Sequence, residues 1–500
     1  CSLVGSEMCI RDRQYANGET PYYVYEYFKR GIEQGDQYFG LNNSKVRSVA
    51  FFANVNYSYA GRYSLNGTVR YEGTNRMGKS RSSRWLPTWN VSGAWNVHEE
   101  KFFSALEPAL SHLTFKASYS LTADRGPADV TNSKVIINSY IPFRPFTGIQ
   151  EPGLRIIDLE NSELTYEKKH ELNLGVDMGF LNNRINFAMD WYTRNNYDLI
   201  GAVNTQGVGG TILKLANVAS MKSHGVEFTL STHNIKSKNF NWNTDFIFSK
   251  AVNEVTDLQQ NANVMDLVAG VGFAKQGYPV RGLFSIPFEK LDENGIPVLR
   301  NESGQLSSTS FNFQERDNTD FLIYEGPTDP TITGSFGNVF TYKGFRLNVF
   351  MTYSFGNVVR LNPVFNAKYS DLSAMTREFK NRWTLPGDEN VTNIPAIMSA
   401  RMYNELRDYA YAYNAYNYSN VRVAKGDFIR LKEVSLSYDF PKSWVKPLLL
   451  SNLSLKVQAT NLFLLYADKK LNGQDPEFFN AGGVASPVPR QFTVTLRLGL

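Results

Sequence analysis

Apolar and polar residues alternate strictly over many short segments of this 500-residue chain, and this pattern leaves few folds open to it. In the segment 63–72, one alternate set holds Tyr63 and Leu65, and the other holds Asn66 and Arg70. The same pattern recurs at 87–96, 168–180, 345–354 and 453–460. A period of two is the pattern of a β-strand whose two faces meet different surroundings. The alternation therefore predicts an all-β chain.

Thirteen strands are predicted, and the connections between them alternate between short and long. The strands span 46–60, 63–72, 87–96, 113–121, 168–180, 185–195, 224–231, 239–251, 335–342, 345–354, 427–438, 453–462 and 490–500. The long connections are 73–86, 122–167, 196–223, 252–334, 355–426 and 463–489. Short turns at one end and long loops at the other are typical of an antiparallel transmembrane β-barrel of the outer membrane. A soluble β-sandwich also alternates, but it has no reason to place all its very long loops at one end.

The parity of the connections also predicts where the C-terminus lies. The last strand runs from a long loop toward the short turns, which lie on the periplasmic side of an outer-membrane barrel. Its apolar row continues to the end of the chain and consists of Phe492, Val494, Leu496, Leu498 and Leu500. Outer-membrane barrels commonly end in such a strand, although Leu500 stands where Phe or Trp is usual. A further strand at 21–28 would bring the number to fourteen, which is even.

The composition agrees with a membrane barrel and argues against other classes of protein. Aromatic residues make up 14% of the chain and often stand at the ends of the apolar rows, as Trp89 and Trp95 do. The aromatic girdles of a barrel lie at these positions. The mean hydropathy is -0.34 and no apolar run approaches the ~20 residues of a membrane helix. The net charge is +5 without a block of Lys or Arg, so nucleic acid is not expected as a partner.

The first residues of the chain differ from the rest. Residues 1–13 contain both cysteines, Cys1 and Cys9, and have neither a strand period nor a helix period. They resemble a translated sequencing adapter and are interpreted as a non-native segment. Residues 14–500 have no cysteine, which suits a protein exported through an oxidising periplasm.

Several motifs, in a consistent order, resemble the SusC/RagA family of TonB-linked outer-membrane proteins. The most specific is Gly426-Asp427-Phe428-Ile429-Arg430-Leu431-Lys432-Glu433-Val434-Ser435-Leu436-Ser437-Tyr438. Others are Asn56-Tyr57-Ser58-Tyr59, Gly225-Val226-Glu227, Gly277-Tyr278-Pro279-Val280, Arg382-Trp383-Thr384-Leu385-Pro386-Gly387-Asp388, Ala459-Thr460-Asn461-Leu462-Phe463, Asp475-Pro476-Glu477 and Pro487-Val488-Pro489-Arg490-Gln491-Phe492. An ordered set is much more specific than any single motif. Two loop motifs depart from the family, at Glu72-Gly73-Thr74-Asn75 and Ala123-Asp124.

The resemblance implies a barrel of twenty-two strands around a plug domain, preceded by a segment that contacts TonB. Residues 14–500 are then expected to be the C-terminal part of such a barrel, with about 14 of its 22 strands and without the plug. Its open edges would carry unpaired backbone groups, which lipid does not tolerate. The implied partners are a SusD-like surface lipoprotein, TonB through the missing N-terminal part, outer-membrane lipid and a glycan or peptide ligand. The implied location is the outer membrane of a Gram-negative cell.

Patterns of catalytic or metal-binding residues are poor in this sequence. The five histidines are scattered over strands and turns without the spacing of metal ligands. The glycine-rich segment 207–210 does not follow the strand–helix pattern that a phosphate-binding loop needs. No Gly-x-Ser-x-Gly motif occurs. We therefore expect neither an enzyme nor a cofactor, and we predict no catalytic residue and no metal ligand.

Candidate substrate contacts come from a tyrosine-rich loop and from the inner face of the barrel. The loop tyrosines are Tyr409, Tyr411, Tyr413, Tyr416 and Tyr418. Flat aromatic rings beside amide groups suit the binding of sugar rings or of the lipoprotein, whereas the alternative is packing between loops or at the outer membrane interface. Arg70, Asn90 and Asn348 are predicted to face the lumen, where they line the import path, hydrate the wall or contact the plug.

The function expected from these features is energised import of glycan oligomers or peptides. Three alternatives stay open: a siderophore or cobalamin receptor that shares the barrel, a passive porin-like barrel, and a soluble carbohydrate-binding β-protein.

Overall fold

The computed structural model describes residues 46–126, 135–140, 153–204, 213–364, 375–397, 408–479 and 489–499. Four sequence predictions lie outside the described residues: the segment 1–13, the strand at 21–28, the glycine-rich segment 207–210 and the terminal Leu500.

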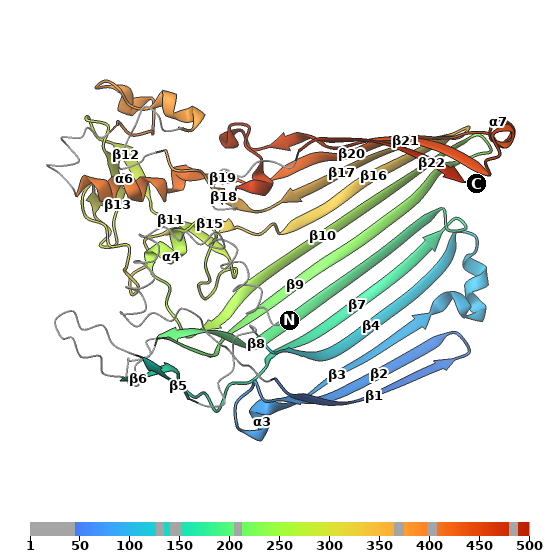
Figure 1. Ribbon diagram of the computed structural model, residues 1–500, viewed down its shortest axis with the longest axis horizontal. Helices are drawn as coiled ribbons and strands as arrows, with labels where there is room; N and C mark the ends of the chain where they lie inside the picture. Colours follow the sequence, from blue (N-terminus) through green and yellow to red (C-terminus); the bar gives the residue numbers. More distant parts are fainter. Residues whose placement is uncertain are drawn as a thin grey trace, which may run out of the picture.

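One curved antiparallel sheet of thirteen strands dominates the described chain (Figure 1). Its strands are β1 (Ser48–Tyr59), β2 (Tyr63–Thr74), β3 (Trp85–Asn96), β4 (Leu110–Asp124), β7 (Glu167–Phe180), β8 (Ile185–Asn204), β9 (Leu213–Lys236), β10 (Phe240–Leu258), β16 (Ile332–Tyr342), β17 (Phe345–Phe355), β20 (Phe428–Asp439), β21 (Asn452–Ala467) and β22 (Gln491–Gly499). Their order in the sheet follows the chain, and β1 and β22 form its two edges. All thirteen predicted strands are present, which confirms the all-β prediction, and the sheet is open.

The short and long connections lie at opposite ends of this sheet (Figure 1). The hairpin turns and the last strand's C-terminal end lie at one end, here named the turn end. The two longer turns at this end contain η1 (Val97–Glu99), η2 (Lys101–Leu106), α7 (Lys442–Val445) and η6 (Lys446–Leu448). The long connections gather at the opposite end, here named the loop end. The predicted alternation of short and long connections is confirmed.

One predicted long loop is mostly strand. β8 continues to Asn204 and β9 begins at Leu213, whereas a loop was predicted over 196–223. The two strands stay paired beyond a bulge, with Ile200 opposite Asn217. At this bulge Asp198 has a positive φ, and an extra residue in a strand shifts the alternation. The sequence pattern therefore does not reveal that the strands continue.

The register gives the sheet one apolar face and one polar face. A row on the apolar face crosses six strands and consists of Tyr57, Leu65, Gly93, Ala117, Leu174 and Trp191. The adjacent row on the polar face consists of Asn56, Asn66, Ser92, Ser118, Asn173 and Tyr192. Leu65 and Val91 on the apolar face are 53% and 50% exposed. Such exposure of large apolar side chains is expected of a barrel face that meets lipid rather than water.

Glycine allows close approach at two cross-strand pairs. Gly225 lies opposite Tyr192, and Gly334 lies opposite Tyr353. A Cβ atom on Gly225 would lie 2.5 Å from the Tyr192 hydroxyl, and one on Gly334 would collide with the Ile247 carbonyl and the Tyr353 hydroxyl. The Tyr353 hydroxyl donates a hydrogen bond of 2.8 Å to the Ile247 carbonyl. The tyrosine rings therefore cover the glycines and fill the space that a side chain would take.

The long connections contain secondary structure of their own. Their strands pair as β5 (Ile136–Tyr140) with β6 (Gly153–Asp158), β11 (Gly282–Ser285) with β15 (Ile323–Pro327), β18 (Val358–Arg360) with β19 (Val423–Lys425), and β12 (Phe288–Leu291) with β13 (Pro297–Arg300) and β14 (Leu306–Ser307). Their helices are α3 (Arg81–Arg84), α4 (Val264–Val268), η3 (Arg377–Asn381), η4 (Asp388–Asn390), α6 (Tyr409–Asn417), η5 (Asn420–Arg422), η7 (Lys469–Leu471) and η8 (Pro476–Phe478). Among the helices of the described residues, none is both long and apolar enough to cross a membrane.

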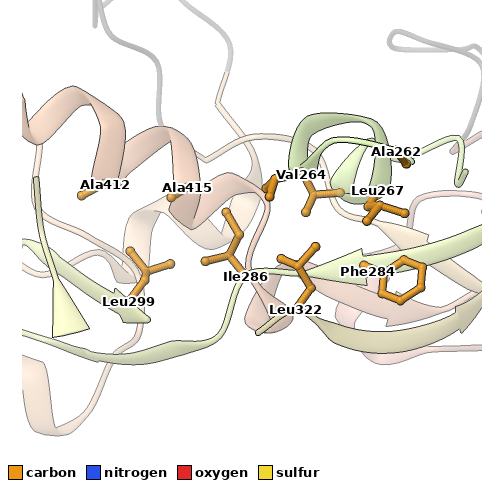
Figure 2. Packing of buried hydrophobic residues seen from close by; sticks show 10 residues of the cluster. Ala262, Val264, Leu267, Phe284, Ile286, Leu299, Leu322, Ala412 and Ala415 are labelled. Carbon is orange, nitrogen blue, oxygen red and sulfur yellow. The ribbon is translucent and has the colours of Figure 1, made fainter. Parts of the chain in front are cut away.

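A large buried apolar cluster lies among these connections at the loop end (Figure 2). It joins Ala412 and Ala415 of α6 to Ile286 and Leu299, and it extends to Leu267 of α4. Burying one leucine or isoleucine side chain contributes about 1.5–3 kcal/mol. The sheet itself has little need of such a core, because one of its faces suits lipid and the other is polar. The cluster therefore stabilises the loop end as a folded unit.

Candidate functional site

The described parts of two long connections, 259–331 and 356–427, fold against each other and form the loop assembly. α4 begins with a capping box, in which Asn263 Oδ1 accepts from the Asp266 amide at 2.8 Å and the Asp266 carboxylate accepts from the Asn263 amide. Further along, the Ile286 amide donates to the Tyr418 carbonyl at 3.0 Å. The Asn420 amide donates in turn to the Ile286 carbonyl at 3.2 Å. The two connections are thus joined by backbone hydrogen bonds as well as by the apolar cluster.

Arg360 lies partly buried within the loop assembly. Its guanidinium donates to the carbonyls of Ser419 at 2.7 Å, Phe284 at 2.6 Å and Val268 at 3.3 Å. Burial lowers the pKa of Arg360 to about 9, with the nearby carboxylate of Glu325 acting against the shift. The guanidinium is therefore protonated at neutral pH. Hydrogen bonds from a charged group are about twice as strong as neutral ones, so Arg360 holds three segments of the two connections together.

Two further arginines, both buried, stabilise the same end of the molecule. Arg422 Nη2 donates to the Asn362 carbonyl and to Glu378 Oε1, each at 2.6 Å. Arg430, at the loop end of β20, binds Asp475 at 2.6 Å and Glu477 at 2.7 Å. The contacts of Arg430 with Asp475 and Glu477 tie the connection that follows β21 to the sheet. The sequence analysis predicted no role for these three arginines, although Arg430 stands in a family motif, because the partners of each are distant in the chain.

The tyrosine-rich segment predicted as a loop is a helix, α6. Alanine is the strongest helix former, and Ala410, Ala412 and Ala415 fall within this segment. Tyr413 and Tyr416 are fully buried, and burial raises the pKa of both hydroxyls. Tyr416 packs edge-on against Phe288, with ring centroids 5.6 Å apart.

The other three tyrosines of this segment are more accessible. Tyr411 is 51% exposed, because residues two positions apart on a helix point to different sides. Tyr409 and Tyr418 are partly buried, and Tyr418 contacts Phe313 edge-on at 6.3 Å. The five tyrosines therefore do not present one common face, and Tyr411 is the one most open to a ligand.

Several charged residues on the polar face of the sheet form ion pairs with residues on neighbouring strands. Lys116 on β4 binds Asp177 on β7 at 2.8 Å. Glu171 binds Arg194 at 3.1 Å, and the Arg194 guanidinium lies 3.9 Å from the ring centre of Tyr192. Such pairing lowers the net charge of the polar face, and hydrogen-bond donors and acceptors remain on its surface. These paired positions are thus hydrophilic and carry little net charge.

The three predicted lumen residues lie on this polar face, Arg70 and Asn90 on adjacent strands and Asn348 far from both. Arg70 pairs with Glu72, which also binds Arg125. Asn90 lies on the neighbouring strand β3, opposite Thr68. Asn348 lies on β17, far along the sheet, where its amide donates to Glu433 Oε1 at 3.3 Å.

A cavity of about 840 Å³ lies between the loop-end portion of β21 and the connection that follows it. β22 pairs with β21 only as far as Thr460, so residues 461–467 extend beyond it. Arg430, Asn362 and Asp475 supply polar groups to the lining, and Leu465 and Phe479 supply apolar surface. Such a mixture of apolar surface and a few polar groups is typical of small-molecule sites.

The histidines show one juxtaposition that their spacing did not indicate. The rings of His98 and His112 lie with centroids 4.0 Å apart at the turn end. His170 stacks between Tyr119 and Tyr197 on the apolar face, at 5.8 and 5.7 Å. Across the described ranges, no group of three or more His, Cys, Asp or Glu side chains is placed to hold a metal ion.

Comparison with known proteins identifies the family. Residues 10–462 match the family described as TonB dependent receptor-like, beta-barrel. The chain belongs to this family. It is 27% identical over 474 residues to TonB-dependent receptor SusC of Bacteroides thetaiotaomicron, covering 90% of this chain and 43% of that protein. It is 25% identical over 452 residues to TonB-dependent receptor P3 of Formosa agariphila, covering 87% of this chain and 42% of that protein.

The fold comparison agrees with the sequence comparison. The structure of the RagAB peptide transporter superposes with a TM-score of 0.71 at 22% identity, over 91% of this chain and 47% of that chain. The resemblance to the SusC/RagA family predicted from the motifs is confirmed. The chain spans less than half the length of the relatives it matches. Membership of this receptor family identifies the thirteen-stranded sheet as part of an outer-membrane barrel.

Proposed function

We propose that this chain forms the C-terminal part, residues 14–500, of the barrel of an outer-membrane importer that is energised through TonB. The observation that carries the proposal is the sheet's polar face, which ends in a folded loop assembly at the loop end. A polar wall lets hydrophilic solutes pass, and a folded assembly at its mouth offers a binding surface. We place the loop end of the sheet outside the cell and the turn end, with the C-terminus, in the periplasm.

The proposed ligands are glycan oligomers or peptides. One relative carries the name SusC, and a structural neighbour is a peptide transporter. A SusD-like surface lipoprotein would close over the loop assembly and hold the ligand there. TonB would act on the plug domain supplied by the remainder of the protein, and the inner wall would then lead the ligand inward.

We propose different roles for the exposed tyrosines, the buried tyrosines and the residues of the polar face. Tyr411, half exposed on α6, is proposed to contact the ligand or the lipoprotein, and the partly buried Tyr409 and Tyr418 are proposed as weaker contacts. Tyr413 and Tyr416 are buried and would hold α6 in position. Arg70, Asn90 and Asn348 are proposed to line the path along the wall.

Uptake of labelled oligosaccharides and labelled peptides by cells that carry the full-length protein tests the proposal. We expect uptake of one of the two ligand classes, and its loss on deletion of TonB. Tyr411→Ala should reduce uptake about tenfold, since ring stacking and hydrogen bonding are both lost, while Tyr411→Phe should keep the stacking part. Equal uptake with and without TonB would overturn the proposal in favour of a passive porin.

The remaining alternatives give other outcomes in the same cells. Binding of a ferric siderophore or cobalamin, without uptake of glycans or peptides, would indicate a different receptor class. Partition of the protein into the aqueous phase without detergent would indicate a soluble β-protein. Co-purification of a surface lipoprotein with the tagged protein is expected only under the proposed function.

A further inference from the structure

The apolar face of the sheet contains a depression near the turn end. In the row from Tyr57 to Trp191, the two central residues are Gly93 and Ala117, whereas their neighbours Leu65 and Leu174 are large. Adjacent strands lie about 4.8 Å apart. The missing side chains therefore leave a trough about two strands wide, whose floor is strand backbone.

Large side chains enclose this trough. The next row toward the turn end holds Trp95 and Phe115, with ring centroids 6.2 Å apart, and Met189 farther along. Together with Leu65 and Trp191 they line a groove of about 720 Å³ whose surface is mainly apolar. The trough is thus a concave apolar groove with large side chains on its sides.

Polar groups gather where the trough meets the turn end. The Tyr63 hydroxyl donates to Glu100 Oε1 at 2.6 Å, and Trp95 Nε1 donates to the same oxygen at 3.3 Å. The Arg62 guanidinium lies 3.5 Å from the Glu100 carboxylate. The hydrogen bond from Tyr63 lowers the pKa of Glu100, so this carboxylate is charged at neutral pH. Arg62 and Glu100 thus place a cation and an anion side by side at the turn end of the apolar groove. Lipid headgroups lie at this end of a membrane-spanning sheet.

We propose that this trough binds one acyl chain of a zwitterionic phospholipid of the periplasmic leaflet. The phosphate of that lipid pairs with Arg62 and its ammonium pairs with Glu100. An acyl chain in the trough contacts the backbone at Gly93 and the walls on both sides, so it makes more close contacts than on a convex face. The assignment to the periplasmic leaflet rests on the orientation given under the proposed function.

Retention of phospholipid by the purified full-length protein tests this site. The protein is extracted in detergent, washed, supplied with phosphatidylethanolamine vesicles and analysed by native mass spectrometry. We expect about one retained phospholipid per chain. Gly93→Leu fills the trough and should lower retention about tenfold, and Arg62→Ala should lower it less. Ala459→Leu, at another small position in an apolar row, is the matched control and should retain the lipid.

The variants are expected to fold. A Cβ atom on Gly93 would meet only the Ser64 carbonyl, at an ordinary 3.6 Å, and a heat-modifiable gel shift reports the folded barrel. If Gly93→Leu fails to fold, Ala117→Leu fills the same trough and decides the question.

Equal retention by the trough variants and the control overturns the proposal. A protein dimer lost in Gly93→Leu, with unchanged lipid, also overturns it and identifies a second copy as the occupant. Since retention is measured without transport, failure of import leaves this test intact.

Discussion

The guanidinium of Arg360 donates a 2.6 Å hydrogen bond to the carbonyl of Phe284, across 76 residues of sequence. The two residues belong to different long connections, one before β16 and one after β17. This contact lies beside the apolar cluster that contains Phe284. The two connections therefore act as one folded unit above the sheet, which suits a surface that has to hold a ligand or a partner.

Removing the charge at position 360 should loosen this unit. Arg360→Met leaves the buried carbonyls of Phe284, Ser419 and Val268 without their donor, and we expect a local loss of about 3 kcal/mol. Hydrogen exchange of 282–285 and 419–425 should rise by about two orders of magnitude, while the sheet stays protected. Arg300→Met removes a more exposed pair with Glu289 and should cost less than about 1 kcal/mol. Equal effects of the two substitutions would contradict the role given to Arg360.

The carboxyl group of Glu325 should make the loop assembly sensitive to pH. Burial raises its pKa, against the opposing effects of Ser285 and Arg360. Because the folded pKa lies above the unfolded one, the stabilising contribution is present below the unfolded pKa and is lost as pH rises through the folded pKa. Glu325→Gln cannot ionise, so it should be more stable than the parent at neutral pH, with the difference vanishing below about pH 4.

Thermal unfolding of the loop assembly between about pH 4 and about pH 8 measures this difference. Glu293→Gln, at an exposed turn position, is the control and should follow the parent. A stability difference for Glu325→Gln that grows toward acid pH would have the opposite sign and would refute the assignment.

The pair of Gly334 and Tyr353 should be required for assembly of the sheet. A valine at position 334 would collide with the Ile247 carbonyl and displace the Tyr353 hydroxyl from its hydrogen bond. Overpacking of this kind costs about 1–3 kcal/mol. Gly334→Val should therefore lower the folded fraction in the heat-modifiable gel shift. Gly67→Val, where a Cβ atom meets nothing within 4 Å, should assemble normally, and a normal yield of Gly334→Val would disprove the requirement.

Much of the sheet could be predicted from the sequence, because a strand with two different faces leaves a period of two. The segment 63–72 and its successors showed this period, and their pairing needed only the order of the chain. The prediction of a loop at the tyrosine-rich segment was wrong, because a short helix within a folded connection leaves no long hydrophobic period in the sequence. The roles of Arg360 and Arg422 in the loop assembly were missed, because the residues to which they bind are tens of residues away in the chain.

The amino-acid sequence was enough to predict the all-β class, the thirteen strands, the two ends of the sheet and the family. All of these depend on local alternation, on loop length or on ordered motifs. The three-dimensional structure was needed to show which tyrosines are accessible, where β8 and β9 end, and which residues share a row across the sheet. These depend on register and on long-range packing, in which a residue's surroundings are set by strands and loops distant from it in the chain.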